Sequence, residues 1–477
     1  MISVFLREQK RYTQIELCEL LECSEEKIIG IIKKLKEYGV LKTVKASDKQ
    51  KDLTDLFDAD VEIIDVEAGD TEFFYVFTFV GVITVAGRVL KCYPKYLLHR
   101  DKPVSELKQV LQVLEKYCSR EQIVRMFNNT DESQSFNLLA VMLFLMNDYF
   151  SNGVYSNTEE IIESNGSGEI LWDKTINETF AFLSNNKPYY VDLQTKKRVN
   201  DDFDYFKRLH ECILTQASSD MKEADLITLF DYTEIDITDE QLDDFGDKEY
   251  ILYRIEKELN EQFNTRKQLV LKTMYAYIEK GGHLYDMDCL SMFGSNSFYK
   301  VWEDVCADIL DNQLYTKLSA IKLPRKLYGD YDSKLKLIEI IEKPRWSITG
   351  LCAEDTLIPD IVSIEGTSFC IFDAKYYNAI LEKNQQPKGQ PGIESITKQY
   401  LYQLSYKKFI SKHGFEVVSN CFLLPTEEKS FIDKGEVSLA MLENLALENI
   451  KVRCIPASSA FEHYLSNTKI NIKEFNL

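Results

Sequence analysis

Two short apolar runs joined by a polar turn form the clearest pattern in the chain. Residues 361–364 and 367–372 are rich in β-branched and aromatic side chains, and Glu365-Gly366 separates them. This pattern predicts a β-hairpin with both strands largely buried. The residues that follow the second run are therefore expected at the edge of a buried sheet.

Helical periodicity flanks this hairpin on both sides. Residues 297–310 predict an amphipathic helix with one apolar stripe, which consists of Phe298, Val301, Val305 and Ile309. Residues 393–410 predict a second helix. Its polar positions at spacing i, i+4 and i+7 are Gln399, Gln403 and Tyr406, which share a face.

The N-terminal pattern is that of two short helices followed by a strand. Residues 13–21 carry apolar positions at helical spacing, and Ser24 is a favourable cap for a helix that reaches Tyr38. Gly39 ends that helix, and residues 40–44 are extended. The order predicts a winged-helix-like domain over residues 1–50, for which DNA reading and protein docking both remain open.

The rest of the chain predicts an α+β multidomain protein. Two or three strands are expected between residues 73 and 92, as part of a small β-unit over residues 60–105 that is a candidate for partner docking. Residues 106–282 predict a mostly helical middle region. Gly281-Gly282 marks the boundary of a C-terminal α/β domain, residues 283–477, with a mixed sheet flanked by helices.

Composition is that of a soluble globular protein. The chain has 477 residues, 45% hydrophobic and 28% charged. The longest apolar run, residues 138–146, is too short to span a bilayer, and the first residues lack the apolar core of a signal peptide. Eleven cysteines are scattered without a Cys-x-x-Cys pair, which favours reduced thiols in a cytoplasm.

Charge and motif content limit what the chain does alone. The formal net charge of −20 argues against broad, nonspecific affinity for DNA, although a local basic patch is still effective because remote charges are screened. No Gly-x-x-x-x-Gly-Lys-Ser/Thr loop occurs, which argues against a P-loop NTPase. A nucleotide-driven reaction would need a motor from a partner.

The residues at the end of the hairpin suit a metal site. Asp373 and Lys375 are two apart and should share a face, and Asp360 should lie beside Asp373 across the strand pair. Neighbouring carboxylates repel unless a proton or a cation is present, and Mg²⁺ prefers oxygen ligands. A structural ion pair is the alternative, because the same acid-x-Lys triplet also occurs in polar segments such as Glu427 to Lys429.

The flanking helices supply further candidates. Glu303, in the middle of the first helix, either completes a metal ligand set or is a surface glutamate. Gln399 and Gln403 on the second helix either support the site or pack in the core. The candidate DNA contacts are Lys398, Tyr406, Lys407 and Lys408, of which the lysines suit phosphate.

The order of these residues resembles the PD-(D/E)xK nuclease superfamily. The order is a helix with Glu303, a strand with Pro359-Asp360, a strand with Asp373-Ala374-Lys375, and a helix with Gln399 and Gln403. The resemblance implies that Glu303, Asp360 and Asp373 bind Mg²⁺, and that Lys375 assists hydrolysis of a DNA phosphodiester. It also implies that Gln399 or Gln403 supports the water or the DNA.

A narrower similarity is to LlaJI-type restriction endonucleases, which are related to McrC, the nuclease subunit of McrBC. It rests on Val301-Trp302-Glu303, on residues 372–377 (FDAKYY), on residues 399–406, and on the shorter stretch 79–97. It implies an endonuclease subunit of an anti-phage restriction system, acting on double-stranded DNA. It also implies a GTP-hydrolysing AAA+ partner, with GTP bound only by that partner, and pairing of subunits for double-strand cleavage.

Two other functions compete with this hypothesis. One is a stand-alone type II or repair nuclease of the same superfamily. The other is a winged-helix DNA-binding adaptor whose nuclease fold is inactive, against which the complete acid-acid-lysine set argues. Cleavage of DNA by the chain alone would indicate the first, and specific binding without cleavage the second.

Overall fold

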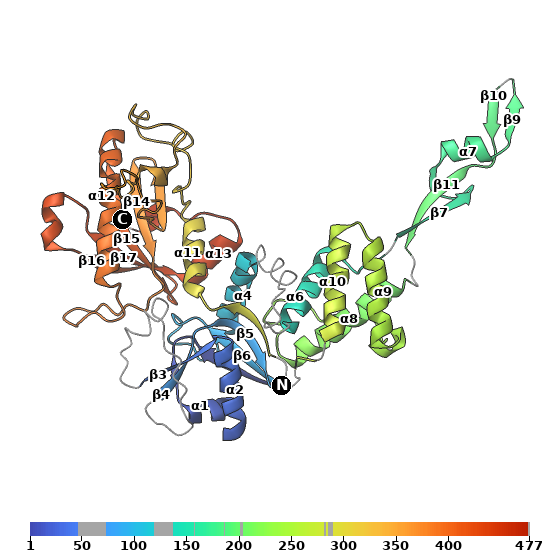
Figure 1. The fold of residues 1–477 in the computed structure, drawn as a ribbon, viewed down its shortest axis with the longest axis horizontal. Helices are drawn as coiled ribbons and strands as arrows, with labels where there is room; N and C mark the ends of the chain where they lie inside the picture. The colour runs from blue at the N-terminus through green and yellow to red at the C-terminus, as the bar shows by residue number, and fades with distance from the viewer. Residues whose placement is uncertain are drawn as a thin grey trace. The chain divides into compact units, whose positions relative to one another are not determined.

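A computed structural model shows a mixed α+β protein (Figure 1). It describes residues 1–45, 73–118, 137–156, 158–185, 187–200, 204–280, 283–284 and 290–475. The chain divides into two compact units, which are treated separately below. Unit 1 comprises Met1, Thr84–Gly87 and Ser135–Met292, and unit 2 comprises Ile2–Ile83, Arg88–Gln134 and Phe293–Leu477.

The predicted pair of N-terminal helices is confirmed. Helix α1 (Gln14–Leu20) begins with a capping box, in which the Thr13 side chain and the Glu16 side chain each bind the other's backbone N–H. Helix α2 (Glu25–Glu37) turns an apolar stripe inward, and its buried residues are Ile28, Ile31, Ile32 and Leu35. Gly39 follows with φ of +66°, a conformation that glycine adopts without strain.

The strands expected between residues 73 and 92 are present, but they belong to two sheets. Strand β4 (Phe73–Phe77) lies between β2 (Arg11–Tyr12) and β3 (Leu41–Lys45) in an antiparallel sheet beside the two helices. A second sheet has the order β1-β6-β5-β12. Its strands are β1 (Ile2–Arg7), β6 (Arg88–Tyr93), β5 (Val80–Val85) and β12 (Leu290–Ser295). Residues 45–55 are polar and predict a linker or wing, and from residue 46 onward this segment lies outside the described residues.

Unit 1 contains helices and a strand-rich arm. The helices are α6 (Leu138–Asn152), α8 (Tyr205–Glu223), α9 (Lys248–Glu261) and α10 (Thr265–Lys280). In the arm, a three-stranded sheet has the order β7-β11-β8, where β7 is Thr158–Ser164, β11 is Gln194–Asn200 and β8 is Glu169–Ile170. Helix α7 (Trp172–Glu178) leads to the hairpin of β9 (Ala181–Ser184) and β10 (Lys187–Tyr190).

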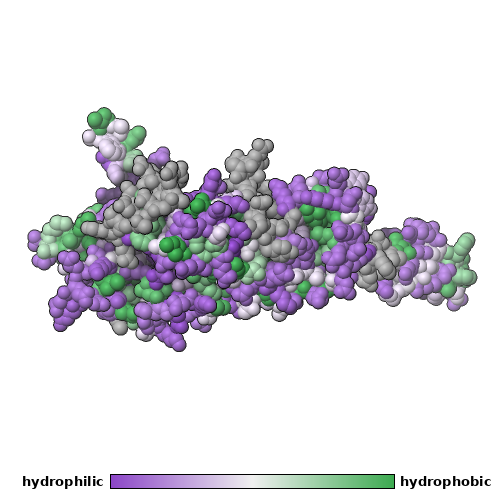
Figure 2. All heavy atoms as spheres, turned by 90° about the horizontal axis from the view of Figure 1, so that it is seen from below, coloured by the Kyte–Doolittle hydropathy of each residue, from purple (hydrophilic) through white to green (hydrophobic). Residues whose placement is uncertain are grey.

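The arm adds short strands that the sequence did not predict to a middle region in which helices make up most of the described regular structure. Every residue of β9 is exposed, so its sequence lacks the alternation of apolar and polar positions by which a half-buried strand is recognised. The same hairpin leaves apolar rings in solvent, including Phe180 and Phe182. Elsewhere, the face in Figure 2 is mostly hydrophilic with scattered apolar residues. Among the described residues, no helix has both the length and the hydropathy needed to cross a membrane.

A five-stranded mixed sheet forms the centre of the C-terminal part of unit 2. Its order is β13-β14-β15-β17-β16, with parallel pairs β14/β15 and β15/β17 and antiparallel pairs at both edges. The strands are β13 (Ile361–Glu365), β14 (Ser368–Ala374), β15 (Val417–Thr426), β16 (Ile432–Val437) and β17 (Ile450–Pro456).

Helices cover both faces of this sheet (Figure 1). On one face, α12 (Ile393–His413) places Tyr406 and Phe409 against Phe369 and Ile371 of β14. On the other, α11 (Phe298–Ile309) buries Trp302, whose ring lies edge-on to Phe461 of α13 (Ala457–Leu465). Both predicted flanking helices are thereby confirmed, and the end of β14 lies between them.

Helix α4 (Val104–Cys118), in the N-terminal part of unit 2, contacts the C-terminal sheet domain. It lies along α13, where Gln109 Nε2 donates to the Ser458 carbonyl over 2.8 Å. The Lys116 ammonium lies 4.2 Å from the centre of the Tyr464 ring.

Candidate active site

The β13/β14 hairpin brings Asp360 and Asp373 together as predicted. The register pairs Ile361 with Phe372, which puts the preceding Asp360 opposite Asp373. The Ala374 N–H donates to Asp360 Oδ2 over 3.0 Å and holds this carboxyl at the strand end. The turn between the strands uses Gly366 with φ of +58°. The apolar runs thus position two acids at the edge of the sheet.

Burial and the neighbouring Asp373 favour the protonated form of Asp360. Burial raises the pKa of Asp360 well above its ordinary value, and its hydrogen bond to Asp373 and the Asp373 charge raise it further. Asp373 itself is buried. Two close carboxylates cannot both ionise cheaply, so one remains protonated unless a positive charge replaces the proton.

Lys375 supplies one positive charge at this pair. Its Nζ lies 3.0 Å from Asp373 Oδ1, which confirms that the two side chains project together. Burial lowers the pKa of Lys375, but the carboxylates of Asp373 and Asp360 outweigh it and raise the pKa above the ordinary value. The lysine is therefore an ammonium at any physiological pH.

Glu303 lies within electrostatic range of the same groups. Burial raises its pKa to about 6, while Lys375 lowers it and Asp373 raises it. Helix α11 is fixed to the strand end through one carbonyl, because the Leu423 oxygen accepts from Trp302 Nε1 at 3.4 Å and from the Lys375 N–H at 2.8 Å. Glu303 is half-buried on α11 near Lys375 and Asp373, and its role as a metal ligand stays a prediction.

Gln399 and Gln403 lie beneath the sheet edge in a buried polar cluster. Gln399 Nε2 donates to the Ile371 carbonyl at 3.3 Å, and Gln403 Oε1 accepts from Asn420 Nδ2 at 3.3 Å. Gln399 Oε1 and Asn420 Oδ1 have no partner among the described protein atoms. Both glutamines thus contact the strands that carry the acids, and their direct role at a reacting water stays a prediction.

The candidate DNA contacts on α12 separate into surface and core. Lys398, Lys407 and Lys408 are exposed, although Lys398 Nζ lies 2.6 Å from Glu394 and Lys407 donates to the Leu445 carbonyl. Tyr406 is fully buried, and its hydroxyl donates to the Leu337 carbonyl at 3.2 Å. Tyr406 thus has no surface on which DNA could bind, because its helix face packs against the sheet.

This position makes Tyr406→Phe a stability variant. It should lower the free energy of unfolding by about 1 kcal/mol, because a buried carbonyl loses its hydrogen bond. DNA affinity should not change, whereas Lys408→Ala on the exposed face should weaken DNA binding at low salt. Chemical denaturation and DNA-binding titrations check both variants. Weaker DNA binding by Tyr406→Phe with unchanged stability would contradict the buried position.

Tyr402 is a site neighbour that the sequence pattern did not reveal. It is buried on α12, and burial raises its pKa to about 12, with the charges of Asp373 and Asp360 raising it and Lys375 lowering it. It lies one turn from Gln399, so a helical-wheel extension of the polar face would have included it.

The donor set fits Mg²⁺ bound mainly by two carboxylates and water. Within the described ranges, no group of three or more His, Cys, Asp and Glu side chains is arranged to hold a metal. Mg²⁺ does not need such a cage, since it retains several waters and commonly binds one or two carboxylates. Two neighbouring carboxyls at the end of a strand are a donor set of this kind.

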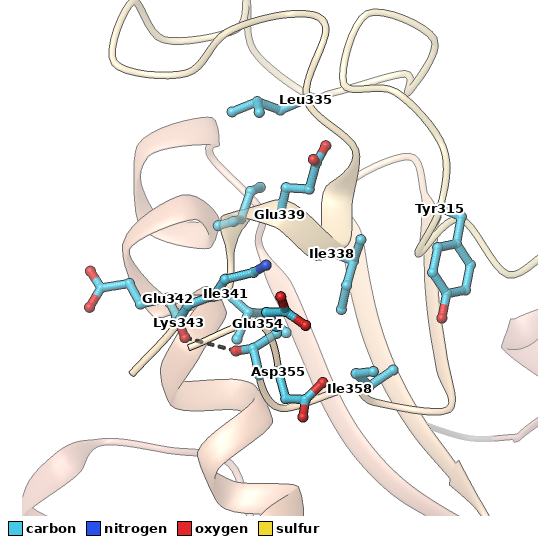
Figure 3. A pocket seen from close by; sticks show the side chains of 12 residues that line it. Tyr315, Leu335, Ile338, Glu339, Ile341, Glu342, Lys343, Glu354, Asp355 and Ile358 are labelled. Carbon is cyan, nitrogen blue, oxygen red and sulfur yellow. Dashed lines mark hydrogen bonds between the residues drawn. The ribbon is translucent and has the colours of Figure 1, made fainter. Parts of the chain in front are cut away.

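A separate cavity of about 570 Å³ opens in the connection before β13 (Figure 3). Its charged lining is mainly acidic: Glu339, Glu342, Glu354 and Asp355, with Lys343 as the basic exception. None of the predicted catalytic residues lines it.

Comparisons with known proteins identify relatives. The model of the family described as LlaJI restriction endonuclease matches residues 79–455. The chain is 27% identical over 413 residues to "Type II restriction enzyme BsuMI component YdjA" of Bacillus subtilis (strain 168), which covers 82% of this chain and 81% of that protein.

Two solved structures are similar at a lower level. Both come from Thermococcus gammatolerans, and each is 12% identical to this chain. An assembly of McrB AAA+ hexamers with bound McrC gives a TM-score of 0.39, covering 98% of this chain and 99% of the other. The McrBC complex gives a TM-score of 0.24, covering 63% and 86%.

Proposed function

The chain belongs to the LlaJI restriction endonuclease family, and from that premise we propose that it is the Mg²⁺-dependent DNA-cleaving subunit of a restriction system. The observation that carries the proposal is the meeting of Asp360, Asp373 and Lys375 at the end of β14, with Glu303 nearby on α11. This is the acid-acid-lysine arrangement of the PD-(D/E)xK nucleases, to which we assign the sheet domain.

In this proposal the carboxylates of Asp360 and Asp373 hold Mg²⁺, and Glu303 completes the ligand set. When bound, the metal supplies an activated water and neutralises charge on the scissile phosphate. Lys375 Nζ, held beside Asp373, orients that water and stabilises the charge that develops on the phosphate oxygens. Glu303, with its pKa raised to about 6, is mostly ionised at pH 7, as a ligand of the metal would need to be.

We further propose that a partner directs cleavage. The curated relative is named as a component of a restriction enzyme, which suggests an enzyme of several subunits. The net charge of −20 leaves the chain with little general attraction for DNA. A GTP-hydrolysing AAA+ subunit would bring double-stranded DNA to the site, and two copies of the chain would cut the two strands of invading phage DNA.

A reconstitution assay tests these proposals. Purified chain is incubated with double-stranded DNA, with and without Mg²⁺, the partner subunit and GTP. We expect cleavage only when all are present, and none when Ca²⁺ or EDTA replaces Mg²⁺. Efficient cleavage by the chain and Mg²⁺ alone would indicate a stand-alone nuclease. Specific DNA binding without cleavage under any condition would indicate an adaptor.

A further inference from the structure

A buried polar cluster lies directly beyond Lys375. It consists of Glu8, Lys95 and Tyr376, each at most 5% exposed. The Tyr376 hydroxyl donates to Glu8 Oε2 over 2.6 Å. The Lys95 backbone N–H approaches the same carboxylate oxygen at 3.2 Å and the Tyr376 oxygen at 3.3 Å. Three groups from distant parts of the sequence therefore meet around one hydroxyl.

Further contacts involve the residues that follow Lys375. Asn378 Nδ2 donates to the Lys95 carbonyl at 2.8 Å, so the segment around Lys95 binds both Tyr376 and Asn378. Lys95 Nζ donates to Gln9 Oε1 at 2.9 Å and lies 4.6 Å from the centre of the Tyr376 ring. The end of β1 and the residues after β6 thus enclose the segment on which the lysine of the site lies.

Lys375 lies where strand pairing no longer holds the backbone. Pairing of β14 with β15 ends at Ala374 and Leu423, so Lys375 lies one residue past the last strand pair. Neighbouring residues in extended backbone point to opposite sides. Tyr376 can therefore enter the buried cluster while Lys375 faces the carboxyls. The hydrogen bond of the Lys375 N–H to the Leu423 carbonyl and the contacts of Tyr376 hold the backbone on the two sides of the lysine.

The chemistry of the cluster is costly for a purely structural anchor. Burial raises the pKa of Glu8, although Lys95 and Tyr376 lower it, and burial lowers the pKa of Lys95 to about 8, although Glu8 raises it. Apolar side chains would fill the same space without this desolvation cost. Hydrogen bonds are directional, so they fix the orientation of the Tyr376 side chain more closely than apolar packing would.

We propose that Glu8 and Lys95 are positioning residues that act through Tyr376 to hold Lys375 Nζ at the Asp360–Asp373 pair. The role of Lys375 in DNA cleavage rests on the proposed function. The N-terminal strand β1 and the segment after β6 then set the geometry of the reaction, although they contribute no group to it. Movement of this N-terminal part, for example on partner binding, would change the cleavage rate.

Tyr376→Phe tests the proposal, because it removes one oxygen and keeps the ring that packs 5.4 Å from Phe298. In the reconstituted complex with Mg²⁺, we expect kcat for DNA cleavage to fall about 10- to 100-fold, the size typical for residues that orient ligands, with KM for DNA unchanged. A second readout does not need cleavage. The labelling rate of Lys375 by an amine-reactive reagent, measured by peptide mass spectrometry, should rise several-fold.

A matched control is Tyr155→Phe in unit 1, which also removes a buried tyrosine hydroxyl, there bonded to Glu258 Oε1 at 2.9 Å. It should change neither kcat nor Lys375 labelling. Glu8→Ala should behave like Tyr376→Phe, whereas Glu8→Gln keeps an acceptor oxygen and should retain most of the activity.

Thermal melting establishes that each variant is folded. If Tyr376→Phe is unfolded, Glu8→Ala and Glu8→Gln test the proposal in its place. A folded Tyr376→Phe protein with wild-type kcat and wild-type Lys375 labelling would overturn the proposal. Equal losses in Glu8→Gln and Glu8→Ala would also overturn it, because the acceptor would then not matter. If the wild-type complex cuts no DNA, the proposed function fails, and the labelling rates still decide whether the cluster positions Lys375.

Discussion

Lys375→Gln should reduce DNA cleavage by about 10²- to 10³-fold, the loss typical when one preorganised stabilising group is removed from a transition state. The Lys375 ammonium lies 3.0 Å from Asp373 Oδ1. The loss should fall on kcat, because the group acts on charge that appears only during reaction. Single-turnover cleavage at saturating Mg²⁺ measures it.

The control for this variant is Lys429→Gln. Lys429 belongs to the same kind of acid-x-Lys triplet, but it is exposed in the connection after β15. The Lys429→Gln variant should cut DNA at the wild-type rate. Because Lys375→Gln leaves two carboxyls without their ammonium, its melting temperature is measured alongside, and Lys375→Arg retains the charge if the glutamine variant is unstable. Wild-type cleavage by a folded Lys375→Gln protein would refute the assignment of the active site.

The parts of the site that sequence predicted are those with strong local periodicity. The apolar runs of β13 and β14 and the turn at Gly366 fix the hairpin, and the hairpin alone brings Asp360 to Asp373. Helices α11 and α12 were likewise visible from stripes of apolar residues at helical spacing. These features depend on neighbours within about twenty residues, so no knowledge of the tertiary fold was needed.

What sequence could not predict depends on distant contacts. Glu8 and Tyr376 are 368 residues apart, and nothing near either residue indicates that they meet. Tyr406 was assigned to the surface because a helix pattern does not say which polar-looking face turns to the sheet. The arm strands were missed for the opposite reason, since β9 is exposed along its whole length and carries no burial pattern.

Asp360→Asn should abolish cleavage and at the same time stabilise the metal-free protein. The pKa of Asp360 is raised in the folded state, so its contribution to stability is fully present below its unfolded pKa near 3.8 and is lost as pH rises through the raised value. Asparagine keeps an oxygen that accepts the Ala374 N–H and removes the charge. In EDTA at pH 8–9, we expect a gain of about 1–2 kcal/mol, as is common when a functional site is relieved of strain.

Mg²⁺ should make wild type more stable than Asp360→Asn, which is the reverse of their order in EDTA. A cation that binds only the folded state stabilises it in proportion to the logarithm of its concentration. The melting temperature of wild type should rise as Mg²⁺ is added, and that of Asp360→Asn should change little. The surface residue Asp330, whose pKa is lowered by Lys412, provides the comparison, since Asp330→Asn should give no stabilisation at high pH. Melting curves from pH 5 to 9, with EDTA and with Mg²⁺, make the measurement. If Asp360→Asn were less stable than wild type in EDTA at high pH, the two carboxyls would not be a repelling pair, and the physical argument for a cation between them would fail.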